Sequence, residues 1–459
     1  MIVEQTAYEM PNDAKVVLKM EDLKLHSNGV FSNVYSGVLK EPYEKKIAIK
    51  KTWPEKYDRN FEFIFLTGRE REKNPFVIQM LFAFSHDYGN KLCESYVFDF
   101  MSDTLHTALK RKLNEMDIRL YSWQMFAGLS YLEDHLVIHR DLKPVNILVD
   151  HTQGTLKIGD FGSSKVYQKG KLNASYQVTR FYRPPELLMK ASDYDMTIDI
   201  WSAGCIVGEM IRKNVLFPGR DGYHQMKLIV RCFGCPTESE MRAMRAAEKV
   251  GGDLITIKPY SLSKLLPEAT VEMIQFMNRV LVYHPQKRLR GRTCLKDEFF
   301  APLFAQGAVR TTTNQPINKI ITPEMYKAAL EDEDVNKTKR LCVFTWASKS
   351  KVEMSIPICE KSTSYEGLHV RRSTLLPREQ RMAREQKSNE NSREERSKDG
   401  KLMPSSENRL PLRGQDKSRP EESDHLASKL RGNRKAVQAN KLTSAYHSVT
   451  QSKPSASGK

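Results

Sequence analysis

The chain of 459 residues has no long apolar run and few cysteines. No stretch reaches the roughly 18 apolar residues of a membrane-spanning helix, so we expect no membrane partner. The first residues, Met1–Gln5, include an acid and lack the basic-then-apolar order of a secretory signal. The seven cysteines are scattered and odd in number, which is typical of a reducing compartment. A cytoplasmic location is therefore expected.

Cys232 and Cys235 have the spacing of metal ligands, but no second Cys or His pair follows at zinc-module distance. We therefore interpret Cys232 and Cys235 as two small apolar residues at the end of a helix, and we do not expect a zinc site there.

Aromatic residues are scarce at the C-terminal end. Residues 361–459 contain no Trp or Phe, and Tyr365 and Tyr446 are their only aromatics. They hold 22 Lys/Arg against 12 Asp/Glu, so ten of the 17 net positive charges lie there. Such a segment cannot bury enough apolar surface to offset the entropy of ordering, and we predict a disordered basic tail. Nucleic-acid binding is disfavoured because acids interleave the cations and stacking aromatics are missing; nuclear import is an alternative role.

The rest of the chain favours an α+β fold with two lobes. Short β-rich runs separated by turn residues fill about 14–101, with one helix expected over 61–71. Helical segments dominate about 102–304, for example 120–135 and 197–213. A small β lobe followed by a larger helical lobe is the result.

Two segments flank this unit. Residues 1–13 suit a short flexible lead. Residues 305–360 suit a partly ordered extension with a helix over 323–334, and the apolar patch Leu341–Trp346 could dock on the larger lobe.

The most informative pattern is His-Arg-Asp-Leu-Lys-Pro-Val-Asn at 139–146, followed at a suitable distance by an Asp-Phe-Gly triplet that begins at Asp160. These two runs have the form of the catalytic and metal loops of a protein kinase. In that reading Asp141 accepts the proton of a substrate hydroxyl and Lys143 meets the transferred phosphoryl group. Asn146 and Asp160 hold Mg²⁺. The pattern predicts phosphoryl transfer with ATP and Mg²⁺ as cofactors.

A lysine and a glutamate complete the expected ATP-phosphate site. Lys50 ends a β-rich run about 90 residues before Asp141, where a kinase lysine pairs the α- and β-phosphates. We choose Glu62 as the helix glutamate that orients Lys50, because its phenylalanine neighbours give that helix an apolar face. Glu70 and Glu72 are the alternatives.

The phosphate-covering loop departs from Gly-x-Gly-x-x-Gly-x-Val. Ser27 and Ser32 replace the outer glycines, and only Gly29 remains, with Asn28 between and Val34 after. Serine adds a Cβ that hinders close approach of the backbone to phosphate. We assign Ser27, Asn28, Gly29 and Val34 to ATP binding and predict weaker or slower ATP handling.

The later motifs narrow the family. The run Ser-Tyr-Gln-Val-Thr-Arg-Phe-Tyr-Arg-Pro-Pro-Glu at 175–186, together with the motifs at 160–165, 199–205 and 216–219, resembles the glycogen synthase kinase 3 (shaggy-like) branch of serine/threonine kinases in the CMGC group. The resemblance covers roughly 22–303 and implies a bilobal protein kinase fold.

The resemblance implies further site residues. Ala48, Phe98, Asp99 and Met101 would surround adenine, with Phe98 narrowing the rear of the pocket. Tyr176 matches an activation-loop tyrosine that such kinases autophosphorylate.

A phosphate on that tyrosine would pair with Arg180 and Arg183. Glu186 and Arg288 match a buried ion pair that braces the larger lobe, and Asp199 matches the carboxylate that holds the catalytic loop.

Kinases of this branch prefer substrates already phosphorylated four residues beyond the target. The candidate pocket for that phosphate comprises Arg140, Lys165 and Arg180. The residue before the helix glutamate should also be basic, but it is Phe61, with Arg59 two residues back. Because a lost charged hydrogen bond costs about 1.5–3 kcal/mol, we expect a weakened preference for phosphorylated substrates.

Two functional hypotheses remain open at this point. The first is an active kinase that acts on protein substrates, with a scaffold protein as a further candidate partner on the larger lobe. The second is a weakly active kinase or pseudokinase that binds partners through the kinase fold; the altered glycine loop favours it, whereas Lys50, Asp141, Asn146 and Asp160 argue against it.

Overall fold

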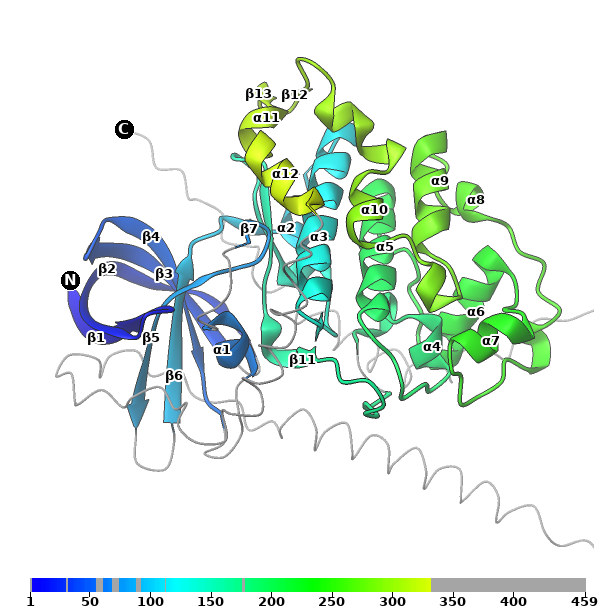
Figure 1. The fold of residues 1–459 in the computed structure, drawn as a ribbon, viewed down its shortest axis with the longest axis horizontal. Coiled ribbons are helices and arrows are strands. Elements are labelled where there is room, and N and C mark those ends of the chain that lie inside the picture. The colour runs from blue at the N-terminus through cyan, green and yellow to red at the C-terminus, as the bar shows by residue number, and fades with distance from the viewer. Residues whose placement is uncertain are drawn as a thin grey trace, which may run out of the picture. The chain divides into compact units, whose positions relative to one another are not determined.

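A computed structural model describes residues 2–29, 32–54, 61–67, 74–87, 92–111, 113–175 and 178–331. Figure 1 shows a β-rich lobe in blue and a larger, mostly helical lobe in cyan to yellow, which confirms the predicted fold class. The predictions for Arg59, Glu70, Glu72, Tyr176 and the tail concern residues outside these ranges. None of the described helices is long and apolar enough to cross a membrane.

The smaller lobe is a closed barrel of antiparallel strands. Alternate residues, among them Tyr35, Ile47, Ile49 and Val97, are buried in its core. The strands follow the order β1-β2-β3-β4-β6-β5 around the barrel, with bounds β1 Val3–Glu9, β2 Ala14–Asn28, β3 Ser32–Glu41, β4 Lys45–Thr52, β5 Met80–Asp87 and β6 Leu92–Asp99. Helix α1 (Phe61–Leu66) is the predicted glutamate-bearing helix.

The expectation of a flexible lead at 1–13 is wrong. Strand β1 pairs with β2 along its length and closes the barrel against β5 through Tyr8 opposite Ala83. Val3, Gln5 and Ala7 are all buried on its inner face. The polar Gln5 interrupts the apolar alternation by which a strand is recognised in sequence.

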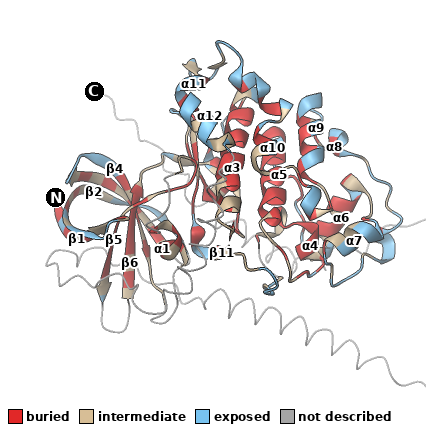
Figure 2. Ribbon diagram, in the orientation of Figure 1, coloured by how far each residue is buried: buried red, intermediate tan, exposed pale blue. Residues whose placement is uncertain are grey.

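The larger lobe is built around two long helices, α3 (Glu115–Asp134) and α5 (Thr197–Arg212), which are buried along most of their length (Figure 2). Asn114 begins α3 with a capping box that it forms with Asp117. The other helices are α2 Leu105–Ala108, α4 Pro185–Leu188, α6 Gly222–Phe233, α7 Glu238–Ala243, α8 Leu262–Leu265, α9 Val271–Val280 and α10 Gly291–Leu295.

Short strands hold the two predicted catalytic loops. The strands are β7 Asp103–Thr104, β8 Val137–Ile138, β9 Ile147–Asp150, β10 Thr155–Ile158 and β11 Lys165–Val166. Loop 139–146 runs from β8 to β9, and β9 pairs with β10, whose end leads into Asp160. Ile158 exchanges backbone hydrogen bonds with Phe76 and Ile78, which ties the smaller lobe to this strand.

The larger lobe continues past residue 304, the boundary that the sequence predicts. β12 (Val309–Arg310), β13 (Gln315–Pro316), α11 (Ile317–Ile320) and α12 (Pro323–Leu330) follow. Arg310 is fully buried beside α3, and Tyr326 of α12 stacks on Trp123 with ring centres 6.0 Å apart. The helix predicted at 323–334 is present over Pro323–Leu330 as α12, and it packs on the lobe.

Candidate active site

Lys50 on β4 lies between two carboxylates from different parts of the chain. Its Nζ is 2.6 Å from Glu62 Oε2 and 2.8 Å from Asp160 Oδ1. Glu62 is only 2% exposed, so the pair with α1 is shielded from water. The predicted pairing of Lys50 with Glu62 is present, and the start of the Asp-Phe-Gly triplet joins it.

Lys50 and Asp160 stabilise each other's charge. Burial disfavours the charged amine of Lys50, but Glu62 and Asp160 outweigh it and raise the pKa of Lys50. Burial also disfavours the Asp160 carboxylate, yet Lys50 outweighs that effect and lowers the pKa of Asp160 to about 2. At neutral pH the site therefore presents a cation and an anion side by side, a pattern suited to ATP phosphates and a divalent cation.

Aromatic contacts hold α1 and the Asp-Phe-Gly triplet together. The Phe161 ring lies 4.6 Å from Phe65 of α1 and 5.1 Å from His139 of the catalytic loop, centre to centre. On the other side of α1, Phe63 stacks on Tyr96 at 5.9 Å. The helix is thus packed in the position that lets Glu62 reach Lys50.

Asp199 fixes the backbone of the catalytic loop, as the sequence predicts. Its carboxylate accepts the backbone N–H groups of His139 and Arg140 at 2.7 and 3.0 Å. Arg140 has a φ of 65°, a left-handed backbone that non-glycine residues seldom adopt. The two hydrogen bonds account for how this conformation is held.

Asp141 is fixed by three side chains. Its Oδ2 accepts from Lys143 Nζ at 2.8 Å, and its Oδ1 accepts from Thr179 Oγ1 at 2.7 Å. Asn146 Nδ2 donates to the backbone oxygen of Asp141 at 2.8 Å. The sequence analysis assigned no role to Thr179. The only feature that could have indicated one was a hydroxyl residue directly before the Arg-Phe-Tyr-Arg run.

The predicted metal-binding residues fit Mg²⁺. The Asn146 amide nitrogen is engaged with Asp141, which leaves the amide oxygen as the outward acceptor. The side chain of Asp160 is 47% exposed. Within the described ranges, no three His, Cys, Asp or Glu side chains come together in a group that could hold a metal ion. This holds for Cys232 and Cys235 as well. Mg²⁺ needs no such cage, since one or two carboxylates plus substrate phosphates usually hold it.

The phosphate-covering loop is a tight turn between β2 and β3. Ser27 pairs with Val34 and Asn28 with Asn33. The Gly29 N–H donates to the Ser32 oxygen at 2.9 Å, and a Cβ on Gly29 would lie 3.1 Å from that oxygen. The turn therefore uses the one remaining glycine and engages its N–H.

The predicted adenine residues lie together at the other end of the site. Ala48 on β4 is opposite Phe98 on β6, which is 7% exposed, and Met101 follows at the junction of the lobes. The Asp99 carboxylate lies 2.5 Å from Lys45 Nζ. The side chain of Asp99 is thus engaged in an ion pair.

The predicted phosphate-pocket residues are held by oxygen acceptors that carry no charge. Arg140 Nε donates to the Ser163 oxygen at 2.6 Å, Lys165 Nζ to Asn173 Oδ1 at 2.5 Å, and Arg180 to the Arg220 oxygen at 2.6 Å. Arg180 thus points to Arg220, and its membership of the pocket stays a prediction. At the position that should be basic, Phe61 stacks on Phe65 at 6.1 Å.

Arg183 is engaged elsewhere than predicted. It is buried, and its guanidinium donates twice to the Val178 oxygen, at 2.9 and 3.2 Å. Val178 has a φ of 68°, a strained conformation for a β-branched residue. Arg183 therefore holds the backbone of the activation segment, and its pairing with a phosphate on Tyr176 stays a prediction because Tyr176 lies outside the described residues.

The predicted brace of the larger lobe is present. Arg288 donates to both oxygens of Glu186 at 2.6 and 2.7 Å, and both residues are buried. This bidentate geometry is the strong form of an arginine–carboxylate pair.

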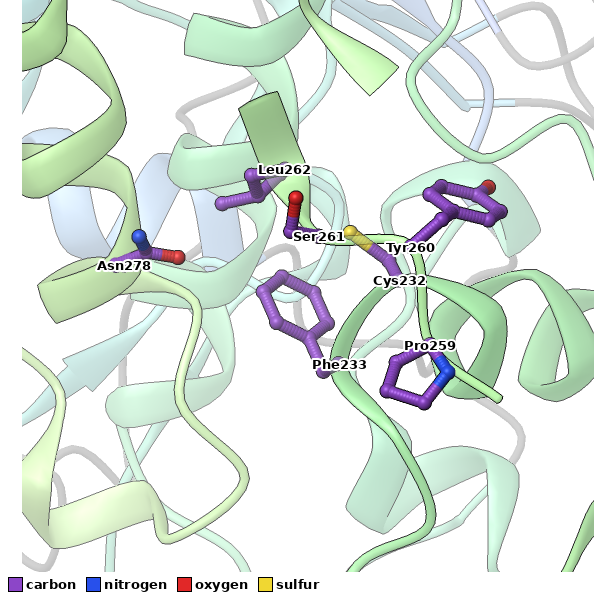
Figure 3. Close-up of a pocket in the computed structure, with 7 residues that line it drawn as sticks. All are labelled: Cys232, Phe233, Pro259, Tyr260, Ser261, Leu262 and Asn278. Atoms are coloured by element: carbon purple, nitrogen blue, oxygen red, sulfur yellow. The ribbon is translucent and has the colours of Figure 1, made fainter. Parts of the chain in front are cut away.

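A cavity of about 500 Å³ lies elsewhere in the larger lobe (Figure 3). It is lined by Cys232 and Phe233 of α6, Leu262 of α8, Asn278 of α9 and the segment Pro259–Ser261. None of the residues assigned to phosphoryl transfer lines it. This cavity is therefore separate from the candidate active site.

Comparison with known proteins agrees with this geometry. Residues 22–300 match the protein kinase domain family. The Caenorhabditis elegans protein gskl-1 is 33% identical over 288 residues, covering 60% of this chain and 77% of that protein. Glycogen synthase kinase 1 of Pyricularia oryzae is 32% identical over 62% of this chain and 73% of its own length. Protein kinase gsk3 of Schizosaccharomyces pombe is 30% identical over 66% and 79%.

Proposed function

The chain belongs to the protein kinase family, as a divergent serine/threonine kinase of the glycogen synthase kinase 3 branch, and on this premise we propose how its residues divide the work of phosphoryl transfer. The observation that carries the proposal is the assembled site. Lys50 contacts both Glu62 and Asp160, while Asp141 is aligned by Lys143 and Thr179. A pseudokinase that only binds partners has no need of this arrangement.

Asp141 orients and deprotonates the acceptor. A serine or threonine hydroxyl of the substrate donates its hydrogen bond to the Asp141 carboxylate and passes its proton there as the phosphoryl group arrives. Thr179 and Lys143 each hold one oxygen of Asp141, so the carboxylate cannot rotate away from the substrate. Lys143 also places a positive charge where the transferred phosphoryl oxygens pass.

Lys50 holds the phosphates of ATP, and Glu62 holds Lys50. Asn146 and Asp160 would hold Mg²⁺, which when bound neutralises charge on the phosphate oxygens. Ser27, Asn28, Gly29 and Val34 cover the phosphates, and Ala48, Phe98, Asp99 and Met101 enclose adenine. Because the covering turn carries two serines in place of glycines, ATP binding is weak or slow relative to a glycine-rich loop.

The decisive test is transfer of labelled phosphate from ATP to a protein substrate. Wild-type protein is expected to label the substrate, and Asp160→Asn to lose that labelling, because the amide cannot replace the charged metal ligand. Glu268→Gln, which alters an exposed carboxylate on the larger lobe, serves as the matched control and should label normally. Equal background in wild type and Asp160→Asn would contradict the enzymatic function.

We further propose that partner proteins dock on the larger lobe beside α6. We also propose that the kinase works in the cytoplasm, with a nuclear fraction as the alternative. Tyr223 and Ile255 support the docking site, being 54% and 61% exposed, large and apolar. Tyr223→Glu should weaken partner binding without changing activity on peptides. Deletion of 361–459 followed by imaging tests the location, and an unchanged distribution rules out a targeting role for the tail.

A further inference from the structure

Two arginines meet beside the residue that holds the catalytic carboxylate. Arg180 directly follows Thr179, whose hydroxyl donates to Asp141, and it begins a short 3-10 turn, Arg180–Tyr182. Its Nη1 donates to the backbone oxygen of Arg220 at 2.6 Å. The two residues lie 40 positions apart in the chain. The fold therefore brings two cationic residues together next to the catalytic loop.

A buried glutamine fixes the two segments that carry these arginines. Gln225 of α6 is fully buried. Its Oε1 accepts the Gly219 N–H at 2.9 Å, and its Nε2 donates to the Phe181 oxygen at 3.3 Å. The same side chain thus holds both the residue before Arg220 and the residue after Arg180. The backbone positions of the two arginines are set by this internal contact.

The charges of Arg180 and Arg220 have no carboxylate partner within the described ranges of the chain. Arg220 is exposed to solvent and Arg180 is half-buried. The neighbouring Asp221 is used as the N-cap of α6, where its carboxylate accepts the N–H of the third helical residue at 2.7 Å. Another exposed arginine of the lobe differs, since Arg242 pairs with Glu238 at 3.5 Å. The Arg180 guanidinium, which has five N–H donors, keeps donors for a further acceptor.

We propose that Arg220, together with Arg180, selects substrates that carry an acidic side chain close to the acceptor serine or threonine. The inference rests on the proposed kinase function and names a specificity-determining residue for the same reaction. The acceptor hydroxyl must reach Asp141, which Thr179 joins to Arg180, and three extended residues of a peptide cover roughly 10 Å. A glutamate or aspartate within three residues of the acceptor is therefore within reach of the arginines. Guanidinium and carboxylate match in two parallel hydrogen bonds.

The test compares peptides of one sequence in which the three residues on each side of the acceptor serine are all glutamate, all glutamine or all lysine. For the full-length wild type we expect kcat/KM to be about fivefold higher for the glutamate than for the glutamine peptide, the scale of one exposed ion pair. Arg220→Ala should lower this ratio at least twofold, and Arg220→Glu should make the lysine peptide the better substrate. The control Arg242→Ala, which removes another exposed arginine, should leave the ratio unchanged.

Two further variants separate this selectivity from a damaged loop and from a phosphate on the activation segment. In Asp221→Asn, asparagine still caps α6 while the negative charge beside Arg220 is lost, so the preference for the glutamate peptide should rise. A damaged loop would not produce that change. Tyr176→Phe should keep the wild-type preference. Its loss there would assign the arginines to a phosphate on Tyr176 and would overturn the inference.

A wild-type ratio near one, or equal ratios in the wild type and Arg220→Ala, would show that the arginines do not select the substrate, while phosphorylation of the peptides would still support the kinase function. Fluorescence polarisation of the labelled glutamate and glutamine peptides measures binding independently of transfer. If no peptide is phosphorylated but Arg220→Ala still abolishes tighter binding of the glutamate peptide, the kinase function fails and the selectivity for acidic peptides stands.

Discussion

Thr179 donates its hydroxyl to Asp141, with Oγ1 2.7 Å from Oδ1. Lys143 Nζ lies 3.4 Å from the same Oγ1 and 2.8 Å from the other carboxylate oxygen of Asp141. The activation segment is thereby bonded to the catalytic loop at the carboxylate that we propose as the acceptor of the substrate proton. A change in the position of the segment would reach the catalytic carboxylate directly.

Replacing Thr179 by valine should lower kcat about tenfold. Valine has nearly the same shape but cannot donate, so Asp141 loses a hydrogen bond worth about 1–2 kcal/mol in a partly buried site. Thr179→Ser keeps the hydroxyl and should retain most of the activity. Steady-state kinetics with a saturating peptide measures both, and KM for ATP should be unchanged; equal activity of the two variants would contradict the role of the hydroxyl.

Restoring glycines to the phosphate-covering turn should tighten ATP binding. In Ser27→Gly/Ser32→Gly the backbone can approach the phosphates without a Cβ in the way, and we expect KM for ATP to fall several-fold. The double variant is compared with Ser36→Gly, a change farther along β3. A KM for ATP that is unchanged or higher would show that the serines do not limit nucleotide binding.

Breaking the ion pair between Arg310 and Asp117 should destabilise the larger lobe. Both side chains are fully buried, with Arg310 Nε 2.6 Å from Asp117 Oδ1. Arg310→Leu leaves an unpaired buried carboxylate, so the free energy of unfolding should fall by about 3–5 kcal/mol.

Two further variants separate the effect of the unpaired buried charge from the effect of losing an arginine side chain. Arg310→Leu/Asp117→Asn removes the unpaired charge and should recover part of the loss. Arg242→Leu disrupts a fully exposed pair with Glu238 and should cost little. Urea denaturation measures the free energy of unfolding of the wild type and the three variants. If Arg242→Leu lowers it as much as Arg310→Leu does, burial of the Arg310–Asp117 pair does not explain its contribution.

Stability should fall as pH drops below about 6.5, in part through His151. Burial, and then the charge of Arg310, lower the pKa of His151 below 6.5. The unfolded chain consequently binds more protons near that pH, and protonation favours unfolding. His151 lies 2.9 Å from the Tyr121 hydroxyl and 3.0 Å from Arg310, both measured at Nδ1.

His151→Gln should flatten this pH dependence. The free energy of unfolding is measured in urea at pH 7.5, 6.5 and 5.5 for both proteins. His86 and His106 retain part of the slope in the variant, because burial also lowers the pKa of each. Identical slopes for the two proteins would exclude His151 as a contributor.

Residues within one short loop were predictable from the sequence. Asp141, Lys143 and Asn146 are close in the chain, so their identities and spacing carry the geometry of the loop. Glu62 was less certain, because the helix that bears it could be aligned to Lys50 in more than one register. The packing of Phe63 on Tyr96 selects the observed one.

Residues joined across long separations were harder to predict. β1 was missed because Gln5 occupies an inward position that apolar residues normally fill. Arg183 was assigned to a phosphate from the family resemblance around Tyr176, and no local pattern indicated that the fold would bury it against the Val178 oxygen. Thr179 lies 38 positions from its partner Asp141, and no local pattern announces that contact.

By itself, the sequence determined the two-lobed kinase fold, the catalytic loop, the candidate metal-binding residues and the altered phosphate-covering turn. Each depends on neighbours in the chain or on simple periodicity. Only the tertiary structure decided that Thr179 meets Asp141, that Arg310 enters the larger lobe, and that Asn173 returns to Lys165. Such contacts depend on how distant elements pack, and the free energy of packing is a property of the whole fold and not of any short segment.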